Sequence, residues 1–254
     1  MTIEQVAEGT FRLREGLVNC YLLKDGGDIT VVDAAWPRSW PHLKQAVRDL
    51  GPMCSVAGIL LTHGHPDHLG SAERGRRYWD VPVLAHRDEI GRVTGKAKGS
   101  SPFTLVPGLL PLLWRPKAFG FVVHAAAHGF MTPHWVAEVT GFEDGVELDL
   151  PGHPRVVLTP GHTEGHCSFY LSVKGVLIAG DALATLDPLT RASGPCLLPD
   201  PLNVDSARAR ASLERLDGIE ADILLPGHGE PHSGPLAGAI QSALSPKTRS
   251  RDDR

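Results

Sequence analysis

The sequence predicts an α/β fold in which two β-sheets pack against each other with helices outside. Two β-rich halves of the chain are each followed by helical segments, and this alternation suits layered packing of sheets and helices. The chain has 254 residues, of which 42% are hydrophobic, so it can bury one sizeable core. We therefore predict a single domain over residues 1–244.

The expected elements follow from the spacing of apolar residues. Leu43, Val47 and Leu50 lie on one face of a helix predicted over Ser39–Leu50, with Ser39 as its N-cap. Further helices are predicted over His68–Trp79 and Val204–Leu216. Strands are predicted over short apolar runs between turn residues, near Thr10–Arg14, Val18–Leu23, Asp28–Val32, Val56–Leu61, Val81–Ala85, Val156–Thr159, Ser168–Ser172 and Val176–Ile178.

Residues 91–141 depart from this alternation. They are rich in Pro, Gly and apolar residues, and Pro107, Pro111 and Pro116 exclude one long helix. Connections of this length are usually functional or disordered, and this one is too apolar for disorder. We interpret it as a lid or wall of a substrate pocket, with a dimer contact or simple packing over the sheet edge as the alternatives.

The segment His63-Gly64-His65-Pro66-Asp67-His68 is the most informative feature of the chain. It places three imidazoles and one carboxylate in six residues, directly after the apolar run Val56–Leu61. These side chains together suit Zn²⁺ and related divalent ions, whereas a core strand would have to desolvate them. A polar loop that happens to be His-rich is the weaker interpretation.

Three other apolar runs end in the same way. Gly161-His162, Gly180-Asp181 and Gly227-His228 each place one ligand-type side chain just past a short buried strand. Strand ends that feed loops are where rigid scaffolds hold reactive groups. Any one of these could be a capped turn, but four such sites at the same place relative to a strand indicate a common metal centre.

Together these motifs resemble the metallo-β-lactamase superfamily of hydrolases, in order from about Val31 to His228. The resemblance implies a four-layer αββα sandwich with two divalent metal ions at one edge of the sheets, most often Zn²⁺, with Fe or Mn as alternatives. Two such ions can share a water and make it hydroxide near neutral pH. By position, the first metal would take His63, His65 and His162, the second would take Asp67, His68 and His228, and Asp181 would bridge both.

Three residues are assigned roles beside metal binding. Asp67 is also the expected catalytic residue, because its carboxylate could orient the nucleophile or pass a proton to the leaving group. Asp33, at the end of the run Ile29–Val32, resembles the early Asp of the family and is expected to orient a ligand or brace a loop; an ordinary turn Asp is the alternative. His166 is expected beside the ligands without being one.

The expected substrate class follows from positions where this chain agrees with, or differs from, particular subfamilies of the superfamily. The Gly-His-Thr-x-Gly-His turn at residues 161–166 is similar to that of hydroxyacylglutathione hydrolases and lactonases. Ala184 stands where many acylhomoserine-type lactonases have Tyr, and Asp181 stands where true metallo-β-lactamases carry Cys or Ser. We therefore expect hydrolysis of a small ester, thioester or lactone by a metal-bridging hydroxide, with a β-lactam hydrolase or a mononuclear iron sulfur dioxygenase as alternatives.

Composition excludes several partners. The formal charge of −4 and the pI near 6.3 give no support to nucleic-acid binding. No apolar run approaches the roughly 18 residues of a membrane span. Because residues 1–5 lack a basic region and an apolar core, we expect no signal peptide. Four cysteines without CxxC spacing suit a cytoplasmic protein. We expect a small-molecule substrate with a hydrolysable acyl group, no nucleic acid or membrane partner, a homodimer, and a disordered tail over residues 245–254.

Overall fold

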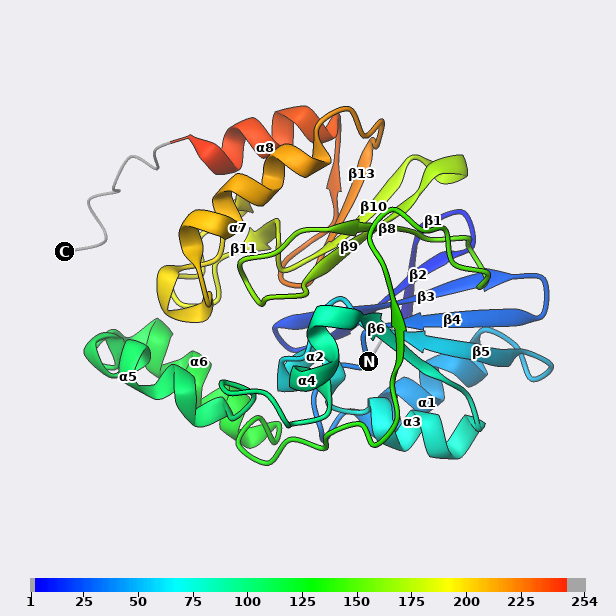
Figure 1. The fold of residues 1–254 in the computed structure, drawn as a ribbon, viewed down its shortest axis with the longest axis horizontal. Coiled ribbons are helices and arrows are strands. Elements are labelled where there is room, and N and C mark those ends of the chain that lie inside the picture. Colours follow the sequence, from blue (N-terminus) through cyan, green and yellow to red (C-terminus); the bar gives the residue numbers. More distant parts are fainter. Residues whose placement is uncertain (1–2, 246–254) are drawn as a thin grey trace.

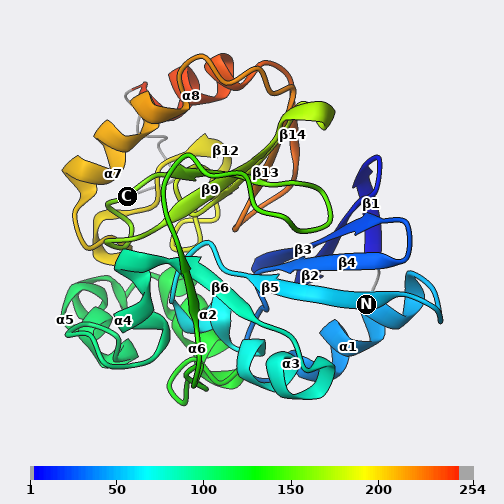
Figure 2. The ribbon, with the colours of Figure 1, turned by 45° about the vertical axis from the view of Figure 1, so that its right-hand side comes forward.

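The computed structural model describes residues 3–245, which fold into four layers. Two sheets face each other across the middle of the molecule (Figures 1 and 2). Helices α1 (Trp40–Asp49) and α3 (Ala72–Trp79) cover the outer face of one sheet, and α7 (Ser206–Ser212) and α8 (Leu236–Leu244) cover that of the other. This arrangement confirms the predicted αββα sandwich.

The first sheet has the strand order β1-β2-β3-β4-β5-β6-β7. Its N-terminal strands pair antiparallel as far as β4, and β4 to β7 run parallel. The strands are β1 (Ile3–Ala7), β2 (Thr10–Glu15), β3 (Val18–Asp25), β4 (Asp28–Val32), β5 (Ser55–Leu60), β6 (Val83–His86) and β7 (Thr140–Phe142).

The second sheet has the order β14-β13-β10-β9-β8, and β10 pairs parallel with β13. A separate hairpin joins β11 to β12. The strands are β8 (Arg155–Leu158), β9 (Cys167–Leu171), β10 (Val176–Gly180), β11 (Ala184–Leu186), β12 (Ser193–Cys196), β13 (Ile223–Pro226) and β14 (His232–Ser233).

Successive side chains of a strand point to opposite faces of its sheet, so they fill the layer between the sheets and the layer under the helices in turn. Leu22 of β3 packs on the helix side, in a buried cluster with Leu43 of α1. Its neighbours Tyr21 and Leu23 lie on the opposite face, in the cluster between the sheets that includes Phe169 of β9. A shift of register by one residue would exchange the side chains of the two layers. Each fully buried side chain of this size contributes about 1.5–3 kcal/mol, so the packing of both layers opposes such a shift.

The ends of four strands meet at one edge of the sandwich. Strands β4, β5, β10 and β13 lead directly into Asp33, the 62–68 loop, Asp181 and the 227–228 turn. The carboxyl ends of parallel strands lie at the same edge of a sheet. The topology therefore brings the predicted metal-ligand motifs of both sheets together.

One local prediction was wrong, and another holds in position only. The helix expected over His68–Trp79 is divided into α2 (Pro66–Leu69) and α3, because the backbone N–H groups of Gly70 and Ser71 bind the carbonyls of Ala35 and Ala34 instead of continuing the helix. Ser39 precedes α1 as expected, but its hydroxyl makes no capping hydrogen bond.

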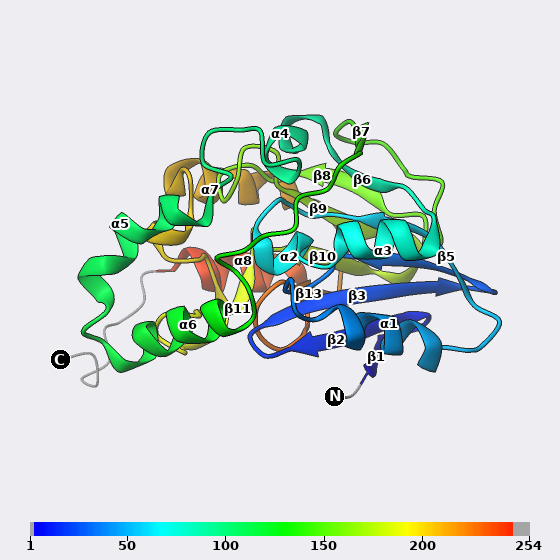
Figure 3. The ribbon, with the colours of Figure 1, turned by 90° about the horizontal axis from the view of Figure 1, so that it is seen from below.

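The 91–141 segment is largely helical. It begins within α4 (Ile90–Val93), which follows the short 3-10 helix η1 (Arg87–Glu89), and the prolines at 107, 111 and 116 each lie in the first turn of a helix. Figures 1 and 3 show α5 and α6 at one end of the sandwich. The elements are η2 (Pro102–Leu105), α5 (Val106–Leu109), η3 (Leu110–Leu112) and α6 (Pro116–Ala127).

The expected tail falls almost entirely beyond these elements. Of residues 245–254, those from 246 onward lie outside the described residues. Among residues 3–245, no helix combines the length and the apolar character needed to cross a bilayer.

Candidate metal centre

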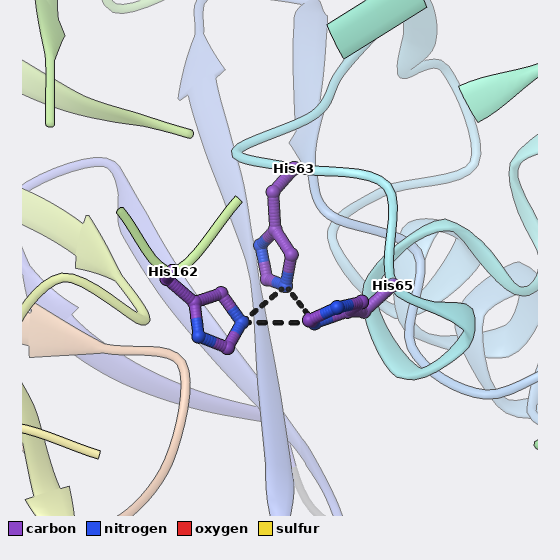
Figure 4. Close-up of side chains that lie close together, drawn as sticks. All are labelled: His63, His65 and His162. Atoms are coloured by element: carbon purple, nitrogen blue, oxygen red, sulfur yellow. Dashed lines mark hydrogen bonds between the residues drawn. The ribbon is translucent and has the colours of Figure 1, made fainter. Parts of the chain in front are cut away.

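Three imidazoles converge at the edge between the sheets (Figure 4). His63 and His65 lie on the loop after β5, and His162 lies after β8. His162 Nε2 is 3.2 Å from His63 Nε2 and 2.8 Å from His65 Nδ1, and the latter is 3.1 Å from His63 Nε2. We call these three residues the imidazole triad. Their nitrogens are close enough to bind one ion.

A second group lies beside the first. Asp67 and His68 come from α2, and His228 follows β13. Asp67 Oδ2 is 3.8 Å from His68 Nε2 and 3.6 Å from His228 Nε2. We call these three residues the mixed triad, and their ligand atoms are also close enough to bind one ion.

Asp181 lies between the two triads. Its Oδ2 is 3.3 Å from both His162 Nε2 and His228 Nε2, and its Oδ1 is 3.4 Å from His68 Nε2. The structure therefore gathers all the side chains that the sequence assigned to metal binding, with Asp181 facing both groups.

The outer nitrogens of four histidines are held by hydrogen bonds. His68 Nδ1 donates to Asp33 Oδ2, His228 Nδ1 donates to the Leu17 carbonyl, and His162 Nδ1 donates to Asn203 Oδ1. His63 Nδ1 donates to the Thr62 hydroxyl, which itself donates to Asp33. In the neutral form of each ring the outer nitrogen carries the proton, so the inner Nε2 would present a lone pair to a metal ion.

Asp33 and His166 contact the centre as the sequence suggested. Asp33 accepts from His68 and from both the backbone N–H and the hydroxyl of Thr62, so it joins α2 to the start of the ligand loop. His166 Nε2 accepts the backbone N–H of Asp181, and its Nδ1 donates to the Thr159 hydroxyl. Both nitrogens of His166 are occupied, so this side chain positions Asp181 and has no lone pair left for a metal.

The two triads differ in charge. Burial and the neighbouring imidazoles lower the pKa of His63, His65 and His162, so these rings are neutral. Burial also opposes a charge on His68, but Asp181, Asp33 and Asp67 raise its pKa to about 10. The carboxylates around the mixed triad therefore favour positive charge at a point that a divalent cation can occupy.

Buried polar atoms without hydrogen-bond partners support the binding of a cation at this centre. His68 Nε2 and Asp181 Oδ1 are buried and have no hydrogen-bond partner, and buried polar atoms without partners are costly unless an ion or water completes them. In the imidazole triad, lone pairs of His63 and His162 face each other at 3.2 Å. Imidazole and carboxylate donors in this arrangement suit Zn²⁺ and related ions.

Two residues beside the centre were missed by sequence reasoning. Glu89 is fully buried and accepts hydrogen bonds from Gly64, Thr163 and Gly165. Asn203 orients His162, and its own amide donates to the Leu198 carbonyl. Glu89 lies in the charged run at residues 86–89, which has the pattern of a solvated turn, and no local signal distinguishes it.

Comparison with known proteins identifies the family. A sequence profile of the metallo-beta-lactamase superfamily matches residues 13–228. The probable metallo-hydrolase YflN of Bacillus subtilis (strain 168) is 31% identical over 91% of this chain and 87% of its own length. A second probable metallo-hydrolase of that organism, YybB, is 25% identical over 91% of this chain and 92% of its own length.

Solved structures agree with this assignment. A metallo-beta-lactamase family protein of Thermus thermophilus has a TM-score of 0.62 and 27% identity, covering 93% of this chain and 77% of that one. A B3 metallo-beta-lactamase with an active-site glutamic acid has a TM-score of 0.65 at 21% identity, covering 95% of this chain and 85% of that one, and at this identity the likeness shows the fold alone. The chain belongs to the metallo-beta-lactamase superfamily, as a metallo-hydrolase.

Proposed function

We propose that this chain is a binuclear hydrolase that cleaves a small ester, thioester or lactone. The observation that carries the proposal is Asp181, which faces both triads and has one buried oxygen without a partner. When bound, two divalent ions supply Lewis-acid chemistry, because they lower the pKa of a shared water and polarise a carbonyl group. Zinc is the proposed metal, and iron and manganese are the alternatives.

The side chains have distinct tasks in this proposal. The imidazole triad would hold one ion and the mixed triad the other, with Asp181 facing both. Asp67 is only 5% exposed and lies beside both His68 and His228. We assign to its carboxylate a proton shuttle: it takes a proton from the attacking water and passes that proton to the leaving atom as the acyl bond breaks.

The segment around α5 and α6 supports an apolar acyl group in the substrate. Ala118 and Phe121 of α6 pack in a buried cluster with Leu202, and Leu17 packs against it. Leu17 and Leu202 are close to the centre, since the Leu17 carbonyl binds His228 and Leu202 precedes Asn203. Deletion of residues 105–114 is therefore expected to raise KM for long acyl chains more than for short ones; equal effects would contradict a lid.

The test is a metal analysis followed by a substrate panel. Protein loaded with zinc is expected to hold about two ions per chain, to hydrolyse thioesters or lactones, and to lose this activity with a chelator and regain it with zinc. Faster turnover of β-lactams would favour the β-lactamase alternative. One iron per chain with oxygen consumption would favour the dioxygenase alternative.

A further inference from the structure

Glu89 connects the two loops that carry the imidazole triad. It lies at the end of η1, is fully buried, and is distant in sequence from both loops. Its Oε1 accepts the Gly64 N–H at 2.9 Å, between His63 and His65. Its Oε2 accepts the Thr163 hydroxyl at 2.9 Å and the Gly165 N–H at 2.8 Å, just after His162.

The backbone around Glu89 approaches both loops closely. A Cβ atom on Gly64 would lie 2.9 Å from Arg92 Cγ, and one on Gly165 would lie 2.5 Å from the backbone nitrogen of Glu89. Both glycines are therefore needed for the contact, because any side chain would push η1 and α4 away from the loops.

Arg92 connects Glu89 to the loop of His162 by a second route. Its Nε is 3.6 Å from Glu89 Oε1, and its terminal nitrogens donate to the Gly99 carbonyl and to Glu164 Oε2. Glu164 belongs to the loop of His162, so the Glu89–Arg92 pair contacts that loop at two places. By contrast, the structure gives Glu89 no contact with a side chain of the mixed triad within residues 3–245.

We propose that Glu89 is a positioning residue for one half of the centre: it holds His63, His65 and His162 in register, while Asp33 orients His68 in the other half. The inference rests on the proposed two-metal function and deepens it. It gives the imidazole triad a buried carboxylate of its own, which acts through the ligand loops, whereas Asp33 contacts His68 directly and reaches His63 only through Thr62. Outer groups that orient metal ligands typically change metal affinity by 10–100-fold when they are lost.

Substitution by glutamine separates this role from simple packing. Glu89→Gln keeps the volume of the side chain, but its amide group has one acceptor oxygen where the carboxylate has two. One loop then faces a donor instead of an acceptor. The geometry of the imidazole triad should loosen while the mixed triad stays intact.

The experiment measures zinc binding to the full chain by competition with a chromophoric chelator, without any substrate. Wild type is expected to bind two zinc ions, and E89Q should bind one of them roughly 10- to 100-fold more weakly. T163V, which removes one donor to Glu89, should weaken the same ion less, and T163S, which keeps the hydroxyl, should restore wild-type affinity. These milder variants decide the matter if E89Q does not fold.

Glu73→Gln is the matched control. Glu73 is also a buried carboxylate that accepts from arginine and from a backbone N–H, but its partners are Arg76, Arg77 and Ala137, outside the metal loops. E73Q should lower thermal stability and leave both zinc affinities unchanged.

Each outcome bears on a separate claim. Unchanged zinc affinity in E89Q and T163V, equal weakening of both ions, or an equal effect of E73Q would overturn the role of Glu89 and leave the hydrolase proposal standing. Wild-type protein that binds two zinc ions but cleaves none of the panel would overturn the proposed function, and the affinities of E89Q would still decide the role of Glu89.

Discussion

The two halves of the candidate metal centre are built in different ways. The imidazole triad consists of neutral rings on two loops, and Glu89 holds those loops through backbone N–H groups and a hydroxyl. The mixed triad contains a carboxylate, and Asp33 contacts its ligand His68 directly. In one half a buried carboxylate fixes the backbone of the ligand loops, and in the other a buried carboxylate binds a ligand side chain. Loss of Glu89 should therefore weaken mainly the ion of the imidazole triad, and loss of Asp33 mainly that of the mixed triad.

The largest loss of activity is expected from a substitution of Asp181, which lies between the two triads. Asp181→Asn keeps the shape of the side chain but removes its charge from between the triads. We expect kcat/KM toward the best substrate to fall by on the order of 10³-fold, because both ions lose a shared anionic ligand. Steady-state kinetics with excess zinc checks this. A loss below about 10-fold would mean that Asp181 does not join the two halves.

Asp33→Asn should weaken zinc binding mainly in the mixed triad, because Asp33 contacts His68 directly and reaches His63 of the imidazole triad only through Thr62. Asp33 has a left-handed backbone conformation (φ 59°) that Asn also tolerates, so the change tests the carboxylate and not the turn. The zinc affinity of one site should fall roughly 10- to 100-fold. Chelator competition on D33N and E89Q should show that the ion weakened most differs between them; the same ion weakened most in both would break the comparison.

Asn203→Ala should have a smaller effect in the imidazole triad. Asn203 contacts His162 and neither of the other two rings. We expect a decrease in zinc affinity of roughly 10-fold, at the lower end of the range for groups that orient a ligand. In the double variant with E89Q, the two losses of zinc affinity should not add fully, because both substitutions act on His162. Full additivity would show that they act independently.

Glu73→Gln should change stability but not metal binding. Its side chain is 11% exposed, and although burial opposes its ionisation, hydrogen bonds from Arg76, Ala137 and Arg77 lower its pKa from 4.5 to about 2. Because the folded pKa lies below the unfolded one, the stabilisation is complete above pH 4.5 and disappears as the pH falls through about 2.

Urea unfolding of the metal-free proteins tests this pH dependence. The free energy of unfolding of wild type should exceed that of E73Q by roughly 1–2 kcal/mol at pH 7. This difference in free energy should shrink between pH 4.5 and pH 2. A difference that grows as the pH falls would contradict the assignment.

Local sequence signals predicted the ligands and one of the two positioning carboxylates. The motif at residues 63–68 and the Gly-His and Gly-Asp turns are each readable over a few residues, and Asp33 directly follows an apolar strand. Glu89 was not predictable, because its partners at 64, 163 and 165 are distant in sequence and two of them are backbone N–H groups that any residue carries. Asn203 contacts His162 across 41 residues and gives no local signal either.

The same reasoning explains the errors in the fold. The apolar spacing of residues 68–79 suits one helix, but the backbone at Gly70 and Ser71 pairs with the segment after Asp33. That tertiary contact has no counterpart in helical periodicity. The layers were predictable because they depend on period-two and period-3.6 patterns that continue along whole elements.

The central claim is that two divalent ions bind in two separately positioned triads. Native mass spectrometry of wild type, E89Q and D33N at a buffered free-zinc concentration just sufficient to fill both wild-type sites measures this directly. We expect two zinc ions per chain in wild type and one in each variant, with one recovered by each variant at higher zinc. Wild-type protein that takes up a single ion, or variants that keep both ions, would contradict the account.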